Sequence, residues 1–303
     1  MHWRVQINST HGQSSGDHVT TEKAGTTVDV LELYRWATQD PHTQAAVLAE
    51  IYQRVRGVPA RLLREDFAGN AADSVAWVAT DASRRAIAVD IDAPTLAYAE
   101  ARAQRLLGEA CCRIEFHCGD VLAPDTPDIA RAQLLCVLNF SCYYFHQRAD
   151  LLRYFERAVA CLDETGVIVL NVFGGIAARS PRVDRQHITP LPEAGTTLAP
   201  FEYEWEQRSF EAIHSRLDCR IHFVVDDPGV SGARHRIDNA FRYDWRLWTL
   251  PELRECLMAA GFREVQVWRH TATEINGKTE VFLGPVDTLE NLDLWLAYVV
   301  GIR

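Results

Sequence analysis

The sequence predicts a doubly wound α/β protein with a small antiparallel insertion, and three patterns support this prediction. An apolar, strand-like run ends near Glu65 and leads through a turn of small residues into a helix-like segment at 74–78. A second strand-like run, Arg85–Val89, follows this helix. Strand, turn, helix and strand in this order form half of a nucleotide-binding sheet. Between residues 201 and 245 apolar and polar residues alternate, which predicts antiparallel strands with one polar face.

The turn after the first strand indicates what kind of nucleotide is bound. It spans 68–71 and contains Gly69, and Asp90 follows at about the 20-residue distance at which an acid accepts from ribose hydroxyls. A dinucleotide site needs G-x-G-x-x-G, because its pyrophosphate lies against the helix N-terminus. This turn lacks the outer glycines, and Glu65 before it would repel a pyrophosphate. The same acid suits a ligand that bears an ammonium and a sulfonium.

This run resembles motif I of the class I S-adenosylmethionine-dependent methyltransferases, which reads acid-x-Gly-x-Gly-x-Gly. Glu65 stands at the acid and Gly69 at the central glycine, while Phe67 and Ala71 replace the flanking glycines. The resemblance implies a Rossmann-like methyltransferase sheet and S-adenosyl-L-methionine as the cofactor.

Further matches occur in the order that this family has. Ala88–Asp92 resembles the second motif, whose acid holds the ribose, and Phe116–Leu122 resembles the end of the third strand, where an Asp accepts from the adenine amino group. Gln133–Ser141 occupies the slot of the fourth strand, although Gln133 replaces its usual opening Asp. Thr249–Phe262 resembles the last helix with its Ala-Gly-Phe exit. The residues predicted to contact the cofactor are Tyr34, Glu65, Phe67, Ala68, Gly69, Asn70, Asp90, Ile91, Asp120, Val121 and Asn139.

Composition limits the kinds of partner. The chain has 303 residues and a formal net charge of −10, which argues against a general nucleic-acid binder because phosphate contacts need a basic surface. No apolar run approaches the roughly 18 residues that span a bilayer, and no secretory signal follows Met1. The eight cysteines have no zinc-site spacing, so we expect reduced thiols and no metal. The protein is therefore expected to be cytoplasmic, with no membrane or nucleic-acid partner.

The chain divides into four predicted parts. A polar tail is expected at 1–27, a helical lid at 28–58, a cofactor-binding methyltransferase domain at 59–175 and 246–303, and an antiparallel substrate-side insertion at 176–245. The two helical patterns of 28–58 resemble the lid of several small-molecule methyltransferases. Tyr34 then either contacts the cofactor or is a packed aromatic.

The insertion begins with a predicted long loop, 178–199, and continues with three strand-like runs near 201–210, 215–225 and 234–245. A row of glutamates in the first run faces a row of arginines in the second. These rows are either cross-strand ion pairs on a solvated face or a site for an anionic substrate.

The candidate catalytic residues follow the fourth strand. Asn139 either orients a nucleophilic amine or caps the next turn. Tyr143 and Tyr144 either line the acceptor pocket or belong to the core, and His146 is either a general base or an exposed residue at a helix start. We expect the insertion and this aromatic cluster to form a compact acceptor pocket.

The function predicted is methyl transfer from S-adenosylmethionine to an N or O nucleophile of a small molecule, releasing S-adenosylhomocysteine. The layout resembles that of glycine and sarcosine N-methyltransferases. Two alternatives remain at this point, namely an NAD(P)-dependent oxidoreductase and a non-catalytic S-adenosylmethionine-binding protein.

Overall fold

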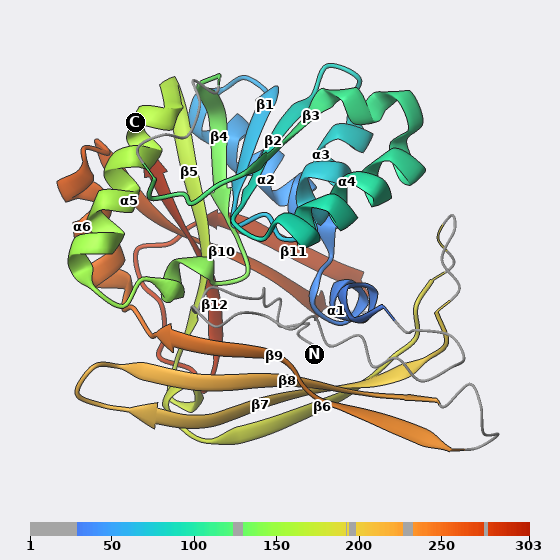
Figure 1. The fold of residues 1–303 in the computed structure, drawn as a ribbon. Coiled ribbons are helices and arrows are strands. Elements are labelled where there is room, and N and C mark those ends of the chain that lie inside the picture. The colour runs from blue at the N-terminus through green and yellow to red at the C-terminus, as the bar shows by residue number, and fades with distance from the viewer. Residues whose placement is uncertain (1–28, 124–129, 192, 194–197, 227–232, 276–277) are drawn as a thin grey trace. The chain divides into compact units, whose positions relative to one another are not determined.

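The computed structural model describes residues 29–123, 130–191, 193, 198–226, 233–275 and 278–303 (Figure 1). The predicted polar tail lies outside the described residues. The chain forms two compact units, a larger one of 40–178 and 248–303 and a smaller one of 179–247 with the chain up to Gln39. The predicted helical segment 28–58 is thus divided between the units. Its first helix belongs with the antiparallel sheet, where the Tyr34 ring lies 4.8 Å from that of Phe241, and its second helix belongs to the larger unit.

The larger unit contains an eight-stranded sheet with the strand order β11-β10-β12-β5-β4-β1-β2-β3. The strands β3, β2, β1, β4 and β5 run parallel to one another. At the other edge β12 runs antiparallel to β5, β10 antiparallel to β12, and β11 antiparallel to β10. This confirms the predicted doubly wound sheet. The strands are β1 (Leu62–Asp66), β2 (Arg85–Asp90), β3 (Ile114–Cys118), β4 (Ala132–Val137), β5 (Leu162–Gly174), β10 (Glu264–Ile275), β11 (Lys278–Pro285) and β12 (Trp295–Ile302).

Helices cover both faces of this sheet (Figure 1). From β1 the chain builds the sheet in two opposite directions, and right-handed crossovers then place the two sets of helices on opposite faces. One set is α2 (Pro41–Arg56), α3 (Ala72–Thr80) and α4 (Ala93–Leu107), and the other is α5 (Arg148–Cys161) and α6 (Leu250–Ala260). Short 3-10 turns lie at Gly108–Arg113, Ser141–Tyr144 and Ala177–Arg179.

The middle strands are apolar because both of their faces are covered. In β5 the run from Val167 to Leu170 is fully buried, which is typical of a parallel strand between two helical layers. Helix starts follow local sequence signals. Asp40 caps α2 ahead of Pro41, and Thr249 and Glu252 form a capping box on α6. No helix among the described residues has the length and apolar character needed to cross a membrane.

The smaller unit combines α1 (Val30–Thr38) with a four-stranded antiparallel sheet in the order β6-β7-β8-β9. Its strands are β6 (Arg182–Ile188), β7 (Phe201–Glu211), β8 (Arg216–Asp226) and β9 (Arg234–Arg246). The last three match the predicted runs. The prediction of a continuous loop over 178–199 is wrong, because β6 occupies part of it as an edge strand. Pro181 and Pro190 lie just outside β6, where a missing N–H breaks no ladder.

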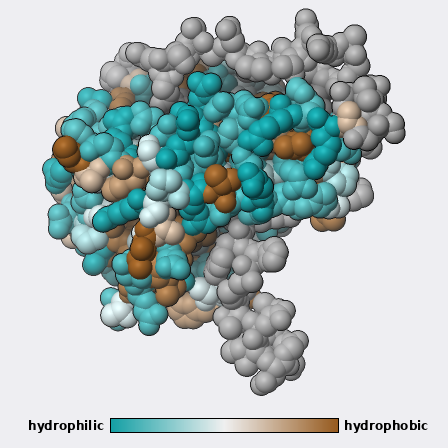
Figure 2. Space-filling view, turned by 90° about the horizontal axis from the view of Figure 1, so that it is seen from below, coloured by the Kyte–Doolittle hydropathy of each residue, from teal (hydrophilic) through white to brown (hydrophobic). Residues whose placement is uncertain are grey.

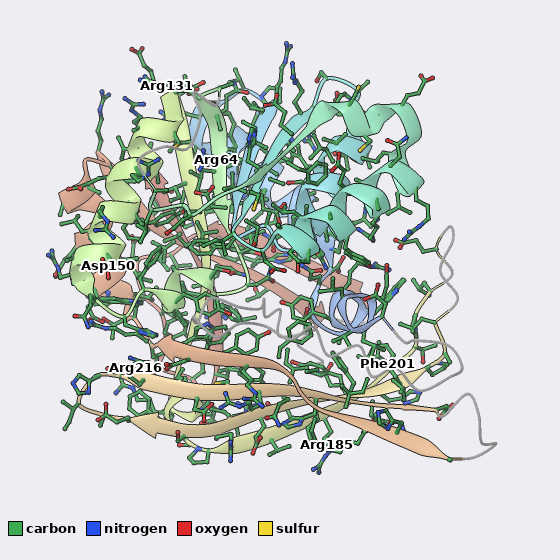
Figure 3. The ribbon with its side chains drawn as sticks, viewed as in Figure 1. Arg64, Arg131, Asp150, Arg185, Phe201 and Arg216 are labelled. Carbon is green, nitrogen blue, oxygen red and sulfur yellow. The ribbon has the colours of Figure 1, made fainter. Side chains whose placement is uncertain are left out.

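The two faces of the antiparallel sheet differ in chemistry, as the alternation predicts. Figure 3 shows Arg185 and Phe201 leaving the sheet on opposite faces. The aromatic face is buried and includes Trp205, Tyr243 and Trp245, whose rings pack at 4.5–6.0 Å.

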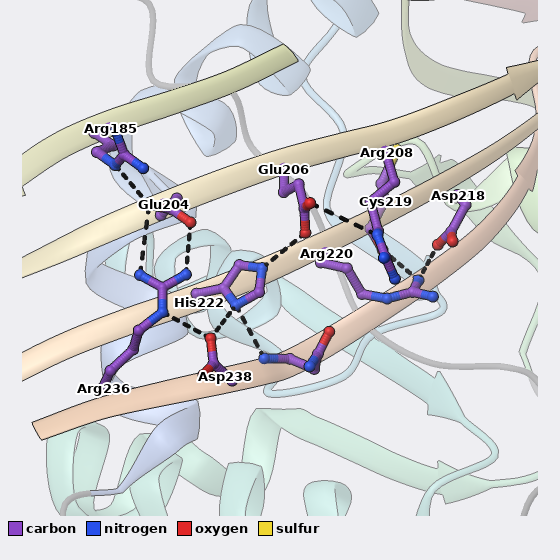
Figure 4. A network of polar contacts seen from close by, with 11 residues as sticks. Arg185, Glu204, Glu206, Arg208, Asp218, Cys219, Arg220, His222, Arg236 and Asp238 are labelled. Atoms are coloured by element: carbon purple, nitrogen blue, oxygen red, sulfur yellow. Dashed lines mark hydrogen bonds and ion pairs between the residues drawn. The ribbon is translucent and has the colours of Figure 1, made fainter. Parts of the chain in front are cut away.

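On the charged face several basic side chains are paired with carboxylates (Figure 4). Glu204 accepts from Arg185 at 2.6 Å and from Arg236 at 2.6 Å. His222 lies between Glu206, at 3.2 Å, and Asp238, at 2.9 Å. The face thus carries cross-strand ion pairs, but not the predicted ones between the glutamates of β7 and the arginines of β8: Arg216 pairs with Asp244 and Arg220 with Asp218. The surface in Figure 2 is mostly hydrophilic, with hydrophobic residues only in separate places.

Candidate functional site

The candidate site lies where the parallel strands reverse their order, between β1 and β4. Asp66 and Val137 are register partners at the carboxyl ends of these two strands. Open α/β sheets bind ligands in the crevice outside this switch point. The predicted cofactor residues of the larger unit all come from the carboxyl ends of β1, β2 and β4 or from the segment after β3.

The turn after β1 has an unusual backbone. Phe67, Gly69 and Ala71 all have positive φ, at 59°, 51° and 50°. Only glycine adopts this region without a steric cost, so Phe67 and Ala71 are held there by their surroundings. Two hydrogen bonds to the β2 strand fix the turn, from Ala68 N–H to the Val89 carbonyl at 2.9 Å and from Gly69 N–H to Asp90 Oδ2 at 2.6 Å.

Asp90 is buried at the end of β2, and its carboxylate organises two loops. Besides Gly69 N–H it accepts from the backbone N–H of Asp92, at 2.9 Å. The cap of α4 is Asp92, whose side chain accepts from Thr95 N–H at 3.1 Å, so Asp90 is not the helix cap. Carboxylate oxygens accept more than one hydrogen bond each. Asp90 can therefore hold the loops and accept from ribose hydroxyls at the same time.

Glu65 lies beneath the turn and caps α3. The residue at the usual capping position is Ala71, which has no side-chain oxygen. Glu65 Oε2 takes that role and accepts from Ser74 N–H at 2.9 Å and from its hydroxyl at 2.5 Å. Burial, followed by the charge of Asp73, raises the pKa of Glu65 well above its ordinary value. The predicted acid is therefore at the site, with one oxygen engaged by the helix.

Asp73 is a residue that the sequence analysis missed. It lies in the first turn of α3 and is 3% exposed, and its Oδ1 is buried without a hydrogen-bond partner among the described residues. Burial, with a smaller contribution from the charge of Asp40, raises the pKa of Asp73 to about 7. In the sequence an Asp here looks like an ordinary residue that complements the helix dipole, so the pattern gave no signal.

The region after β3 is more open. Asp120 is exposed and its Oδ1 accepts from Leu122 N–H at 2.8 Å, while Val121 beside it is buried. Ile91, next to Asp90, is 44% exposed. Asn70 is buried and its Oδ1 accepts from Ala72 N–H at 3.2 Å.

Asn139 follows β4 with a φ of 54° and is 1% exposed. Its Nδ2 is buried and has no hydrogen-bond partner in the described part of the chain. A buried amide group without a partner is unfavourable, and such groups are rare in folded proteins. Asn139 therefore offers a donor at the switch point, beside the turn after β1.

Tyr143 is held in the core. Its hydroxyl donates to the Phe173 carbonyl at 2.6 Å and accepts from Phe173 N–H at 3.2 Å, and burial raises its pKa well above the ordinary value. Tyr144 and His146 are half-buried. The structure therefore gives Tyr143 a structural role, and contact of either tyrosine with a substrate stays a prediction.

A buried ion pair supports the end of β1. Arg64 Nε donates to Asp66 Oδ1 at 2.6 Å, and Tyr154 donates to Asp66 Oδ2 at 2.9 Å. Arg64 lies inside the larger unit (Figure 3). The Phe67 ring lies 5.7 Å from the ring of Tyr154, so the turn that begins at Phe67 packs against a residue that is hydrogen-bonded to Asp66.

Tyr34, the remaining predicted cofactor contact, belongs to the smaller unit. Its ring packs on Phe241 there. Its contact with a cofactor stays a prediction. Within the described part of the chain, no group of three or more His, Cys, Asp or Glu side chains is arranged to hold a metal.

Comparison with known proteins addresses the fold. No family model and no curated protein sequence matches the chain. Several solved structures do match the fold of the chain. DesVI of Streptomyces venezuelae aligns with a TM-score of 0.64 at 15% identity, over 91% of this chain and 99% of its own. An S-adenosylmethionine-dependent methyltransferase from Clostridium acetobutylicum aligns with a TM-score of 0.60 at 15% identity, over 90% of this chain and 97% of its own, so this chain shares the fold of these methyltransferases.

Two further structures agree. An amino pentose methyltransferase of calicheamicin biosynthesis from Micromonospora echinaspora, solved with S-adenosylmethionine bound, aligns with a TM-score of 0.60 at 15% identity, over 92% of this chain and 100% of its own. A sugar N-methyltransferase from Streptoalloteichus sp. aligns with a TM-score of 0.59 at 16% identity, over 100% of this chain and 99% of its own. The resemblance seen in the sequence motifs is thus confirmed at the level of the fold.

Proposed function

We propose that the protein transfers a methyl group from S-adenosylmethionine to an N or O nucleophile of a small molecule. The observation that carries this proposal is the charge of the switch-point edge. Glu65, Asp73 and Asp90 are buried around the turn at Gly69. Among the described residues, the charges that shift the pKa values of Glu65 and Asp73 belong to other carboxyls and not to basic side chains.

Such an edge favours a cationic nucleoside over a dinucleotide. S-adenosylmethionine brings an ammonium and a sulfonium to the site, whereas the pyrophosphate of NAD brings negative charge. Buried carboxylates without cations are costly, and a cationic ligand lowers that cost. The turn also lacks the glycine pattern that a pyrophosphate needs.

Each part of the cofactor has a matching place in this proposal. The ribose hydroxyls donate to Asp90, and the adenine lies between Ile91 and the Asp120–Val121 segment. Ile91 supports this placement, since an exposed apolar side chain beside a buried acid is what a flat base would cover. Asn139, at the end of β4, faces the transferred methyl group or the acceptor with its unpaired amide.

The reaction needs little covalent chemistry from the protein. The sulfonium makes its methyl group electrophilic, so the protein's main task is to align the nucleophile with it. The amino pentose and sugar N-methyltransferases of the same fold support a small-molecule acceptor, with a neutral amine as the first choice of nucleophile and a hydroxyl as the second.

A methyl-transfer assay tests the function. The protein is incubated with methyl-labelled S-adenosylmethionine and separate extracts of metabolites, proteins and nucleic acids. We expect label in the metabolite fraction only, and less of it with Asp90→Ala. Label in protein or nucleic acid with none in metabolites would overturn the small-molecule proposal. Binding of S-adenosylhomocysteine with no transfer to any extract would support a non-catalytic protein.

Once an acceptor is known, the aromatic residues can be tested. Tyr144→Ala should reduce turnover several-fold while the affinity for S-adenosylhomocysteine stays within about twofold, because the half-buried ring has no assigned cofactor contact. Equal losses in both measurements would place Tyr144 at the cofactor instead.

A further inference from the structure

Two buried polar atoms at the starts of α2 and α3 have no hydrogen-bond partner in the described part of the chain. They are Oδ1 of Asp73, an acceptor, and Nε2 of Gln44, a donor. Each residue is 3% exposed. Buried polar atoms are normally paired, so two such atoms in one region are candidates for hydrogen bonds to a ligand.

The fold brings these two atoms to the candidate site. Helix α3 begins directly after the turn that follows β1. Helix α2 leads back into β1, so its start lies toward the carboxyl end of that strand, and it packs along α3. Tyr298 of β12 is hydrogen-bonded to Gln44, and the charge of Asp73 acts on it. Its hydroxyl donates to Gln44 Oε1 at 3.0 Å. Burial raises the pKa of Tyr298, the hydrogen bond to Gln44 lowers it, and the charges of Asp73 and Asp40 raise it further.

The charges that act on Asp73 and on its neighbour Glu65 come from carboxyls of nearby elements. Asp40 caps the start of α2 and acts on Asp73, Glu65 lies in β1, and Asp90, which acts on Glu65, ends β2. The charge of Asp40 also acts on His270 of β10, whose pKa is lowered by burial. Glu65 already accepts from Ser74, and Asp40 caps α2. Among the described residues, no basic side chain contributes to the pKa shifts of Glu65 and Asp73, and Asp73 Oδ1 is an acceptor without a donor there.

An amino acid in its zwitterionic form supplies both missing partners. Its ammonium donates hydrogen bonds and carries the positive charge that the acids lack, and its carboxylate accepts. The methionine portion of S-adenosylmethionine has both groups, and S-adenosylhomocysteine keeps them.

We propose that Asp73 and Gln44 bind the amino-acid end of the cofactor, with Asp73 Oδ1 accepting from the α-ammonium and Gln44 Nε2 donating to the α-carboxylate. This assignment rests on the proposed function. It gives a cofactor contact to two residues outside the motifs of the sequence.

The pairing makes binding depend on pH. The ammonium favours the ionised form of Asp73, so ligand binding lowers the pKa of this carboxyl from its raised value of about 7. Affinity for S-adenosylhomocysteine should consequently fall as the pH drops below 7, and binding at pH 7 should release a fraction of a proton.

Calorimetric titration of the full chain tests the proposal. The probes are S-adenosylhomocysteine and 5′-methylthioadenosine, which lacks the amino-acid end. Asp73→Asn should weaken S-adenosylhomocysteine by about ten- to a hundredfold, as loss of a charged hydrogen bond does, and leave 5′-methylthioadenosine within about twofold. Asp81→Asn is the matched control, because it removes an exposed charge at the other end of the same helix. It should change neither affinity.

The outcomes separate this proposal from the function on which it rests. If the unmodified chain binds neither probe, the proposed function fails and this proposal with it. If Asp73→Asn leaves both affinities unchanged, or weakens both probes alike, the cofactor remains and the amino-acid subsite is overturned. If Asp73→Asn does not fold, the unmodified chain decides the question. Titration in two buffers of different ionisation enthalpy should show proton release with S-adenosylhomocysteine and none with 5′-methylthioadenosine, and equal release would contradict the proposal.

Discussion

Replacing Asp90 by Ala should weaken cofactor binding strongly. In the structure Asp90 accepts from Gly69 N–H at 2.6 Å and from Asp92 N–H at 2.9 Å, and in the proposed complex it also accepts from the ribose. Loss of a charged acceptor costs about 1.5–3 kcal/mol. Titration calorimetry should therefore show S-adenosylhomocysteine binding about ten- to a hundredfold more weakly. Stability should also fall, because two backbone N–H groups lose their acceptor.

Asp92→Ala is the matched control for Asp90→Ala. It removes a neighbouring carboxylate that caps α4 through Thr95 N–H, and this should cost about 1 kcal/mol of stability. Because we assign Asp92 no contact with the cofactor, the Asp92→Ala protein should bind S-adenosylhomocysteine as tightly as the unmodified chain. Asp90→Ala that loses stability but binds like the unmodified chain would refute the reasoning, because Asp90 would then be structural only.

Three further substitutions test the turn at Gly69, the ion pair of Arg64 and the hydroxyl of Tyr143. Gly69→Val places a β-branched residue at a φ of 51° and should abolish S-adenosylhomocysteine binding with nearly native far-UV circular dichroism; normal binding would show that the turn is only structural. Arg64→Ala leaves the buried Asp66 charge unpaired and should lower the unfolding free energy in urea by about 3–5 kcal/mol, whereas a loss below about 1 kcal/mol would contradict a buried pair. Tyr143→Phe removes the hydroxyl bonded to Phe173 and should cost about 1–3 kcal/mol in the same measurement, with cofactor affinity unchanged; weaker binding at full stability would return Tyr143 to the site.

The fold was predictable where local patterns and the architecture agree. The turn at Gly69, the strand that ends at Asp90 and the helix start at Thr249 each have a signal within a few residues. The alternation in β7, β8 and β9 likewise identified the antiparallel sheet. β6 was missed because an exposed edge strand between prolines has little apolar content. No strand was predicted after Trp268, although the apolar run 295–302 forms β12.

The candidate site was only partly predictable for a different reason. The sequence identified Asp90 by its distance from Gly69, and the structure brings the two residues into hydrogen-bond contact. The sequence did not show that Glu65 caps α3, because that role follows from Ala71 being unable to cap. Asp73 and Gln44 gave no signal either, because their unpaired atoms result from the packing of two helices. Tyr143 is close to the site in sequence, yet its hydroxyl is bonded within the core, so its contact with a substrate stays a prediction.

The most direct test of the account is calorimetric titration of the full chain with S-adenosylhomocysteine and, separately, with NAD. The buried acids at the switch point should give saturable binding of S-adenosylhomocysteine and no binding of NAD. Saturable binding of NAD with none of S-adenosylhomocysteine would contradict the account, because the pyrophosphate would then occupy the edge that the structure makes acidic.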